Sequence, residues 1–298
     1  MDVSAGAAVS AKLRAVWRAW VALMDRREPP TALALVRIGL AVVLLVDYLN
    51  VWRLGLVGPL WSRAPDGFAI GHAVLDAHVL WTIATVALVM IALGAATRIA
   101  CIAFVLASAQ LSTLTPDSES ALDMLARVTF VILALSRCNA KWSIDALIFG
   151  ARDEIEAWPR YLLLLQLVWV YFSAGINKSI GDWGPQGGFT ALANALQDPH
   201  AARFGPEWVG TIYPLTRVAT GLTMAFELAA PLFLIAYFKG WRVRWVWIGL
   251  GMAFELGIAI GLRLGSFPFG MLALYPVLIW PPQRLKAPVP AKRASSSS

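Results

Sequence analysis

Charged residues are scarce in this sequence. Asp, Glu, Lys and Arg make up only 14% of its 298 residues, whereas hydrophobic types make up 59%. A water-soluble chain of this length needs a far larger polar surface, so the composition excludes an ordinary soluble protein. Several hydrophobic runs approach the roughly 20 residues that cross the hydrocarbon core of a bilayer. The sequence therefore predicts an all-α integral membrane protein without a soluble domain.

Cysteine and histidine are also rare, with two and three residues. Cys101 and Cys138 fall near the predicted cytoplasmic side, where thiols stay reduced, and neither belongs to a CxxC or Cys/His pattern. His72 and His78 are six residues apart, a spacing that does not place two side chains on one helix face. The sequence therefore predicts no metal site. It also contains no nucleotide-binding loop, zinc-protease motif or serine nucleophile motif.

Eight hydrophobic segments predict a polytopic bundle of about eight transmembrane helices, at residues 34–52, 73–93, 97–114, 119–136, 160–177, 213–237, 243–262 and 266–280. With the N-terminus placed in the cytoplasm, 17 of the 25 Lys and Arg residues fall on the cytoplasmic side. This bias follows the positive-inside rule and predicts a multi-pass protein of a cell inner membrane with both termini cytoplasmic. The net charge of +7 then reflects topology, and no nucleic acid is expected as a partner.

The two ends of the chain differ from its hydrophobic middle. Residues 1–30 are basic and amphipathic, with Val16, Trp17 and Trp20 on the apolar face. We expect this segment to form an interfacial helix on the inner leaflet. Residues 31–282 form the predicted membrane domain, and residues 283–298 have the basic, proline- and serine-rich composition of a disordered cytoplasmic tail.

Ionisable residues inside the predicted membrane helices need a specific reason, because each costs about 2.5–3.5 kcal/mol on insertion. Arg37, Arg127 and Glu227 are expected to hold helices together through interhelical salt bridges and hydrogen bonds. Asp123 precedes Arg127 by four residues, so the two share a helix face and can pair directly.

A second set of polar residues converges on one layer of the membrane. The predicted topology places Asp47, Asp123, Tyr171 and Glu255 in the outer half of the bilayer, and Lys178 at its outer rim below the long loop 178–212. The plain interpretation is a set of structural salt bridges and hydrogen bonds. The alternative is a site in which Glu255, with no cation in its own helix, handles protons.

The stretch around Lys178, LLLLQLVWVYFSAGINKSIGDWGPQGG, resembles the fifth-span signature of the HTTM family. This family is the membrane domain shared by vitamin K-dependent gamma-carboxylase and many bacterial proteins. The matching residues are Tyr171-Phe172, Ala174-Gly175, Lys178, Trp183 and Gly184. Four further stretches resemble family segments in the same order: ALALVRIGLAVVLLVD, LSRCNAKWSIDAL, AFELAAPLFLI and GMAFELGIAIGLRLGSFPFGMLALYP. The resemblance covers about residues 32–282.

The resemblance implies a membrane enzyme that acts on a reduced quinone, either menaquinol or a vitamin K-like quinol, at the outer face of the membrane. It implies Lys178 as the base that deprotonates the quinol. Glu255 is the second candidate catalytic residue, and it stands where the family commonly carries histidine. The candidate substrate-binding residues are Tyr171, Asp182, Trp183, Asp123 and Asp47.

A non-enzymatic role is the alternative function, in which the protein assists the maturation or export of a secreted peptide. This hypothesis predicts that loop 178–212 binds a polypeptide and that Lys178 is only an interfacial anchor. Membrane lipid is a partner in both cases. A transporter is a weaker third possibility, because the sequence has no paired glycine- or proline-broken helices in matching halves.

Overall fold

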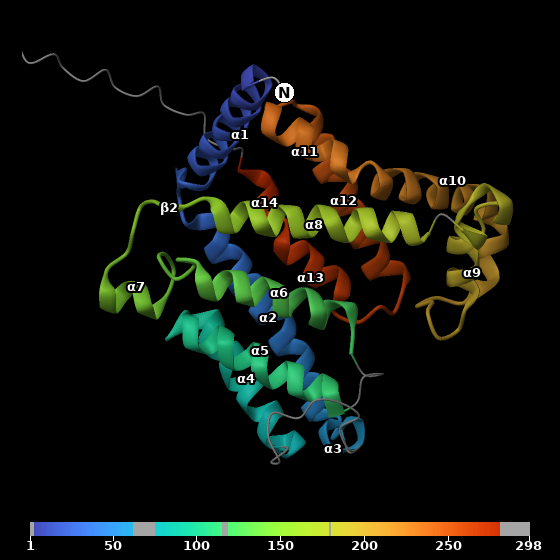
Figure 1. Cartoon of the computed structure of the whole chain (residues 1–298). Coiled ribbons are helices and arrows are strands. Elements are labelled where there is room, and N and C mark those ends of the chain that lie inside the picture. The colour runs from blue at the N-terminus through green and yellow to red at the C-terminus, as the bar shows by residue number, and fades with distance from the viewer. Residues whose placement is uncertain (1–2, 62–74, 115–118, 179, 281–298) are drawn as a thin grey trace, which may run out of the picture.

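The structure is a computed structural model that describes residues 3–61, 75–114, 119–178 and 180–280 (Figure 1). Helices dominate these ranges, so the predicted all-α class is confirmed. The strands β1 (Arg27–Glu28) and β2 (Ile155–Glu156) form one short antiparallel pair. The predicted tail 283–298 and His72 lie outside the described residues.

The long helices coincide with the predicted hydrophobic segments. Six segments correspond to one helix each: α2 (Thr31–Arg53), α4 (Ala77–Leu93), α5 (Thr97–Leu114), α6 (Ala121–Leu135), α8 (Trp158–Asn177) and α12 (Val243–Gly261). The other two are each divided, into α10 (Val209–Leu228) with α11 (Ala230–Lys239), and α13 (Phe267–Leu274) with α14 (Pro276–Ile279).

Helix length decides how many of these segments can cross a bilayer unaided. In the described part of the chain, α2, α5, α8 and α12 are long and apolar enough, and α10 with α11 qualifies as a fifth, bent crossing. Helices α4 and α13–α14 are apolar but shorter, and α6 has 15 residues. The protein is therefore an all-α membrane protein, while eight crossings stay a prediction.

Proline explains the bend of 56° between α10 and α11. Pro231 lies in the first turn of α11 and has no N–H to donate to the carbonyl four residues earlier. That carbonyl belongs to Glu227. The bend therefore falls at a charged residue that is itself only 2% exposed.

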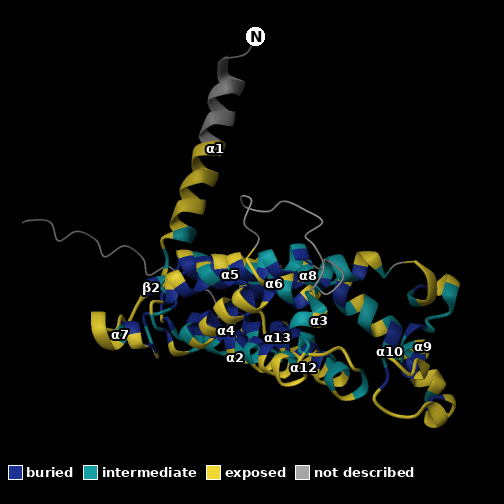
Figure 2. Ribbon diagram, turned by 90° about the horizontal axis from the view of Figure 1, so that it is seen from below, coloured by how far each residue is buried: buried dark blue, intermediate teal, exposed yellow. Residues whose placement is uncertain are grey.

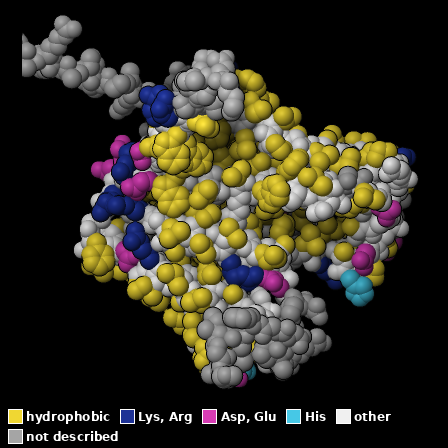
Figure 3. Space-filling view, viewed as in Figure 1, with side chains coloured by type: hydrophobic (Ala, Val, Ile, Leu, Met, Phe, Trp, Pro, Cys, Tyr) yellow, Lys and Arg dark blue, Asp and Glu magenta, His cyan; other side chains and the backbone are white. Residues whose placement is uncertain are grey.

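The surface of the bundle is apolar. Figure 2 shows buried residues along the inward faces of the helices and exposed residues along the outward faces. Many outward side chains are large and hydrophobic, such as Ile99 and Trp169, which are 71% and 63% exposed. Figure 3, which shows the face of the molecule seen in Figure 1, has hydrophobic side chains over most of that face and a concentration of charged side chains at one end. This is the surface expected of helices that contact lipid.

The bundle has two distinct ends (Figure 1). Because β1 pairs with β2, helices α2 and α8 both begin at the same end, next to α7 (Ile144–Phe149). We refer to this as the α7 end. At the opposite end, which we call the α9 end, α8 finishes and a loop packs against α10. That loop contains η2 (Gly181–Trp183), η3 (Pro185–Gly187), α9 (Ala191–Gln197) and η4 (Pro206–Trp208).

Two helices lie at the edges of this arrangement. The four-residue α3 (Val57–Leu60) follows α2 at its C-terminal side. Helix α1 (Val3–Met24) projects away from the bundle (Figure 2). Val16, Trp17 and Trp20 are all exposed on it. Its placement on the membrane surface stays a prediction.

Candidate functional site

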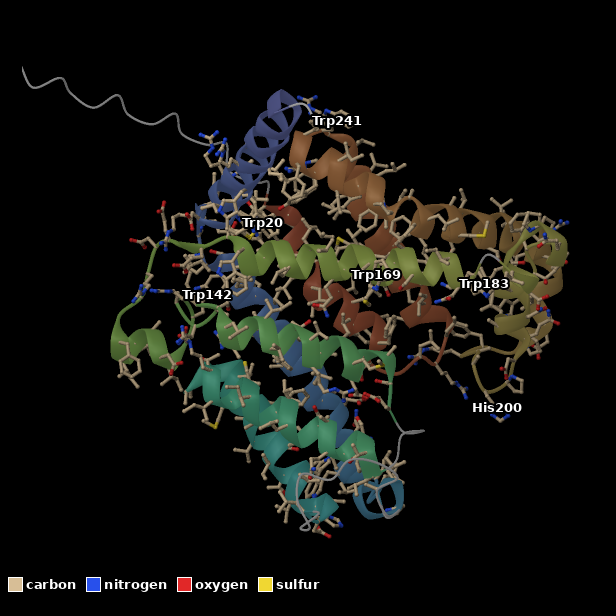
Figure 4. All side chains as sticks on the ribbon, in the orientation of Figure 1. Trp20, Trp142, Trp169, Trp183, His200 and Trp241 are labelled. Atoms are coloured by element: carbon tan, nitrogen blue, oxygen red, sulfur yellow. The ribbon has the colours of Figure 1, made fainter. Side chains whose placement is uncertain are left out.

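Lys178 lies at the mouth of a polar cluster at the α9 end. It is the C-cap of α8, and its Nζ is 2.5 Å from Oε1 of Glu227 on α10. The Lys178 side chain is 25% exposed and that of Glu227 is 2% exposed. Nζ also lies 4.5 Å from the ring centroid of Trp183, which Figure 4 shows beside the end of α8. The lysine therefore faces solvent on one side and a buried carboxylate on the other. We call this group the Lys178 cluster.

A close approach of α8 and α10 makes this contact possible. A Cβ atom on Gly175 would lie 2.9 Å from Cβ of Glu227 and 2.9 Å from the backbone N of Leu228. Only glycine leaves room for the α10 backbone at that distance. Gly175 and the bend at Pro231 together bring Glu227 to the end of α8.

A second polar group lies two turns earlier on α8. The hydroxyl of Tyr171 donates to Oε1 of Glu255 on α12 at 2.6 Å and lies 2.9 Å from the hydroxyl of Tyr275. All three side chains are buried. The glycine at position 251 leaves room for Tyr275, because a Cβ atom on residue 251 would collide with the Tyr275 hydroxyl. The sequence predicts that Tyr171 and Glu255 lie in one layer, and this geometry agrees with it. The sequence does not predict Tyr275, because a tyrosine next to a proline carries no chemical signal of its own.

Aromatic rings form the walls around both groups. Phe226 stacks on Trp247 with ring centroids 4.7 Å apart and meets Tyr171 edge-on at 5.3 Å. Phe254 lies 6.0 Å from Phe226, and its ring centroid is also 6.0 Å from Lys178 Nζ. These rings surround the ionisable groups with apolar surface and keep water from their buried sides.

Both glutamates keep one oxygen unpaired. Oε2 of Glu227 and Oε2 of Glu255 are buried and have no hydrogen-bond partner among the described residues. A buried acceptor without a donor is unfavourable, and native structures contain few of them. The site therefore has unused capacity to accept hydrogen bonds from a hydroxyl group.

Asp182 lies in the loop of the α9 end and is exposed. Its Oδ2 accepts a hydrogen bond from Asn194 Nδ2 at 2.8 Å, which joins η2 to α9. Arg217 on α10 donates to the carbonyl of Gly188 at 2.7 Å. These contacts hold the loop, and Trp183 with it, over the end of α8.

Asp47 and Asp123 belong to a different place from Lys178. Both line a cavity of about 100 Å³ together with Trp81 and Glu119. Ser266 donates to Oδ1 of Asp47 at 2.6 Å. Neither Lys178 nor Tyr171 nor Glu255 lines this cavity, so the structure divides the predicted polar layer into two sites.

Among the described residues, no group of three or more His, Cys, Asp and Glu could hold a metal ion.

The expected pairing of Asp123 with Arg127 is wrong. Asp123 is the third residue of α6, and its carboxylate turns back to accept hydrogen bonds from the N–H and hydroxyl of Ser120, which forms a capping box. Arg127 forms its ion pair with Glu119 and donates to Ser112 at 2.8 Å. The Asp123 carboxylate therefore caps the N-terminus of α6 and does not pair with Arg127.

Arg37 lies at the α7 end and is fully buried. Its guanidinium donates to the carbonyls of Ile91 at 2.5 Å, Ala92 at 3.0 Å and Trp142 at 2.5 Å. These bonds tie α2 to the end of α4 and to the segment before α7. Of the two predicted kinds of contact, Arg37 forms hydrogen bonds, and all of its partners among the described residues are backbone carbonyls.

A buried ion pair at the α7 end was not predicted. Nε and Nη2 of Arg160 donate to Glu28 at 2.8 Å and 2.6 Å, and Nη1 donates to the Tyr237 hydroxyl and to the carbonyls of Val277 and Trp280. We call this group the Arg160 cluster. Arg160 and Glu28 are 132 residues apart, and no spacing in the sequence connects them.

Comparison with known families gives one match. The model of the HTTM domain matches residues 25–282, a range that contains every residue of both clusters. No solved structure matches the chain.

Proposed function

Because the chain belongs to the HTTM domain family, and is therefore a vitamin K-dependent gamma-carboxylase-like membrane protein, we propose that it acts on an isoprenoid quinol at the α9 end of the bundle. The sequence predicts that this end faces the outside of a cell inner membrane. The contact between Lys178 and Glu227 is the observation on which the proposal rests. It places a reachable amine directly in front of a buried carboxylate, inside aromatic walls.

The residues of the site fit a reduced quinone. A quinol offers two hydroxyl donors on a flat aromatic ring, and the site offers the unpaired oxygens of Glu227 and Glu255 together with the rings of Trp183 and Phe254. Lys178 is the member that a ligand can reach, since a quarter of its side chain is exposed. When bound, the quinol would supply a hydroxyl group that can lose its proton. The resulting quinolate would be a strong reductant, and its oxygen a strong nucleophile.

Lys178 would act as the base in this proposal. It must first give up its own proton, and Glu227 can take it across the 2.5 Å between Nζ and Oε1. The free amine can then accept a proton from a substrate hydroxyl at the exposed side of the cluster. Tyr171, itself hydrogen-bonded to Tyr275, would hold Glu255 in a fixed orientation. From there Glu255 would orient the quinol or receive a proton from it.

The test compares the wild type with Lys178→Met, purified as full chains in mild detergent. We expect menaquinone in lipids extracted from the wild type. With dioxygen supplied, we expect turnover of added menaquinol to its epoxide, one oxygen atom entering the epoxide and the other leaving as water. The Lys178→Met variant should lose this turnover. Lys239→Met is the matched control, because Lys239 is an exposed lysine at the end of another helix, and it should keep wild-type turnover.

Two results would contradict the proposal. Equal turnover in Lys178→Met and the wild type would remove Lys178 from the chemistry. A wild-type preparation that carries no quinone and turns over no quinol, but carries a small peptide, would point to the peptide-maturation role instead.

A further inference from the structure

The α7 end contains a basic pocket that the proposed quinol site does not use. Its volume is about 320 Å³, within the range of small-ligand pockets. Three arginines from three separate parts of the chain line it: Arg98 at the start of α5, Arg137 after α6, and Arg152 after α7. Asn139 and Phe149 also line it. We call this the α7 pocket.

The acidic residue in this pocket, Asp145, has its oxygens occupied by hydrogen bonds from the fold. Both carboxylate oxygens of Asp145 accept hydrogen bonds, from the N–H groups of Ala96 and Thr97, the Thr97 hydroxyl and the Asn139 amide, at 2.7–3.0 Å. Arg137 lies 3.4 Å from Glu156. Among the described residues, no salt bridge joins Arg98 or Arg152 to a carboxylate. The pocket therefore presents two exposed guanidinium groups, those of Arg98 and Arg152, that form no salt bridge with a carboxylate of the described residues.

The walls of the pocket are fixed in place. Ala96 and Trp142 adopt left-handed backbone conformations, with φ of 44° and 52°, which are unfavourable for residues other than glycine. The N–H of Ala96 is bound by Asp145 and the carbonyl of Trp142 by Arg37. These bonds hold the turn between α4 and α5 and the segment before α7 in one conformation. The backbone next to Arg98 and the start of α7 is thus fixed beside the pocket.

Helix α7 carries an exposed apolar face beside this pocket. Leu147 and Phe149 are 86% and 83% exposed, and Ile148 is 66% exposed. On the other side of α7 lies an open groove of about 530 Å³, lined by Trp142, Leu147 and other apolar residues and by Lys141. Water is an unfavourable surrounding for such side chains, whereas the boundary between headgroups and acyl chains suits both them and the flanking cations.

We propose that the α7 pocket binds the phosphate of an anionic phospholipid. Arg98 and Arg152 hold the phosphate, with Arg137 beside them. Leu147 and Phe149 enter the layer of acyl chains, and the groove with Lys141 receives a chain of the same lipid. A free phosphate ion would satisfy the arginines but would leave this apolar face in water. The sequence predicts that this end is cytoplasmic, the side where anionic lipids attract basic segments.

Lipid selectivity of the full chain tests this proposal. The wild type and the double variant Arg98→Gln/Arg152→Gln are placed in nanodiscs of phosphatidylcholine with a minor share of phosphatidylglycerol, and the phosphatidylglycerol retained by the protein is measured by native mass spectrometry. Each arginine near an anionic surface contributes about fivefold, so we expect about 25-fold weaker retention in the variant. Thermal unfolding should shift upward with phosphatidylglycerol for the wild type only.

A charge-matched control separates the site from a general effect of positive charge. Arg53→Gln/Arg263→Gln removes two exposed arginines elsewhere and should keep wild-type selectivity. Leu147→Ser/Phe149→Ser keeps all charges and should also lose phosphatidylglycerol. Equal losses in the two arginine variants, or unchanged retention in Arg98→Gln/Arg152→Gln, would overturn the proposal. An equal thermal shift from inorganic phosphate alone would also overturn it, because the ligand would then be the free ion.

Discussion

The two ends of the bundle each contain a buried ionic cluster, and the clusters differ in completeness. At the α7 end, every nitrogen of the Arg160 guanidinium donates a hydrogen bond and both oxygens of Glu28 accept one. At the α9 end, Glu227 and Glu255 each keep a buried oxygen without a partner. The side chain of Arg160 is 1% exposed, whereas that of Lys178 is 25% exposed.

This difference separates a structural role from a binding role. A fully paired charge has no free donor or acceptor for a ligand. The bonds of Arg160 on α8 connect this helix to β1, α11 and the end of α14. An incompletely paired charge is less stable by itself and becomes satisfied when a ligand arrives. Natural proteins accept such local deficits mainly at functional sites. The comparison predicts that substitutions in the Arg160 cluster affect folding most, and that substitutions in the Lys178 cluster affect ligand chemistry more than folding.

The largest effect on stability is expected for Arg160→Met. The substitution leaves the carboxylate of Glu28 buried without a counter-charge, which typically costs about 3–5 kcal/mol. We expect a large loss of folded, monodisperse protein in detergent, measured by thermal unfolding with size-exclusion chromatography.

A second substitution tests the cause of that loss. Replacing both partners, in Arg160→Met/Glu28→Met, removes the unpaired charge, and apolar replacement of a whole buried pair is often close to neutral. The double variant should therefore recover much of the stability. If it is as unstable as Arg160→Met alone, the bonds from Arg160 to Tyr237 and the carbonyls of α14 carry the stability instead.

The next largest effect is expected for Gly175→Ala, which tests the approach of α8 to α10. The new Cβ would meet the Glu227 Cβ and backbone at 2.9 Å, so the helices must separate. Overpacking of this kind costs about 1–3 kcal/mol. Gly257→Ala on α12 is the control, since a Cβ there meets nothing within 4 Å. Equal unfolding temperatures for the two variants would show that the close approach is not required.

A smaller effect on stability is expected for Lys178→Met. Its partner Glu227 is buried, but Lys178 itself is partly exposed, so the cost should fall between that of a surface pair and that of a buried pair, at about 1–2 kcal/mol. Quinol turnover should nevertheless be lost in full. A loss of stability as large as that of Arg160→Met would erase the distinction between the two clusters.

The sequence predicts the helices well and the clusters only in part. Hydrophobic runs of the right length located the long helices, because apolar composition directly reports contact with lipid or core. Charged and polar groups in a membrane segment are costly, and the family motif surrounds Lys178, so the sequence predicts Lys178, Tyr171 and Glu255 as site residues. It predicts only a structural role for Glu227, the residue that contacts Lys178.

What the sequence could not supply is which polar groups meet. Asp47 and Asp123 have the same predicted depth as Tyr171, yet they line a separate cavity with Glu119, because depth does not fix the direction in which a helix face points. Arg160 pairs with Glu28 only because β1 and β2 bring two distant helix starts together. Tertiary contacts of this kind have no local pattern.

The smallest effect is expected from pH, through Asp145 at the α7 end. Burial raises the pKa of this carboxyl, but hydrogen bonds from Thr97, Asn139 and Ala96 outweigh it and lower the pKa below the ordinary value of 3.8. A carboxyl with a lowered pKa in the folded state contributes stability that is complete above the unfolded value and is lost as pH falls through the folded value. The difference in unfolding temperature between the wild type and Asp145→Asn should therefore stay constant down to about pH 5 and shrink only below pH 3.8. A difference that already shrinks near pH 6 would mean that Asp145 is not held in its charged form, and the α7 end would then be as incompletely paired as the α9 end.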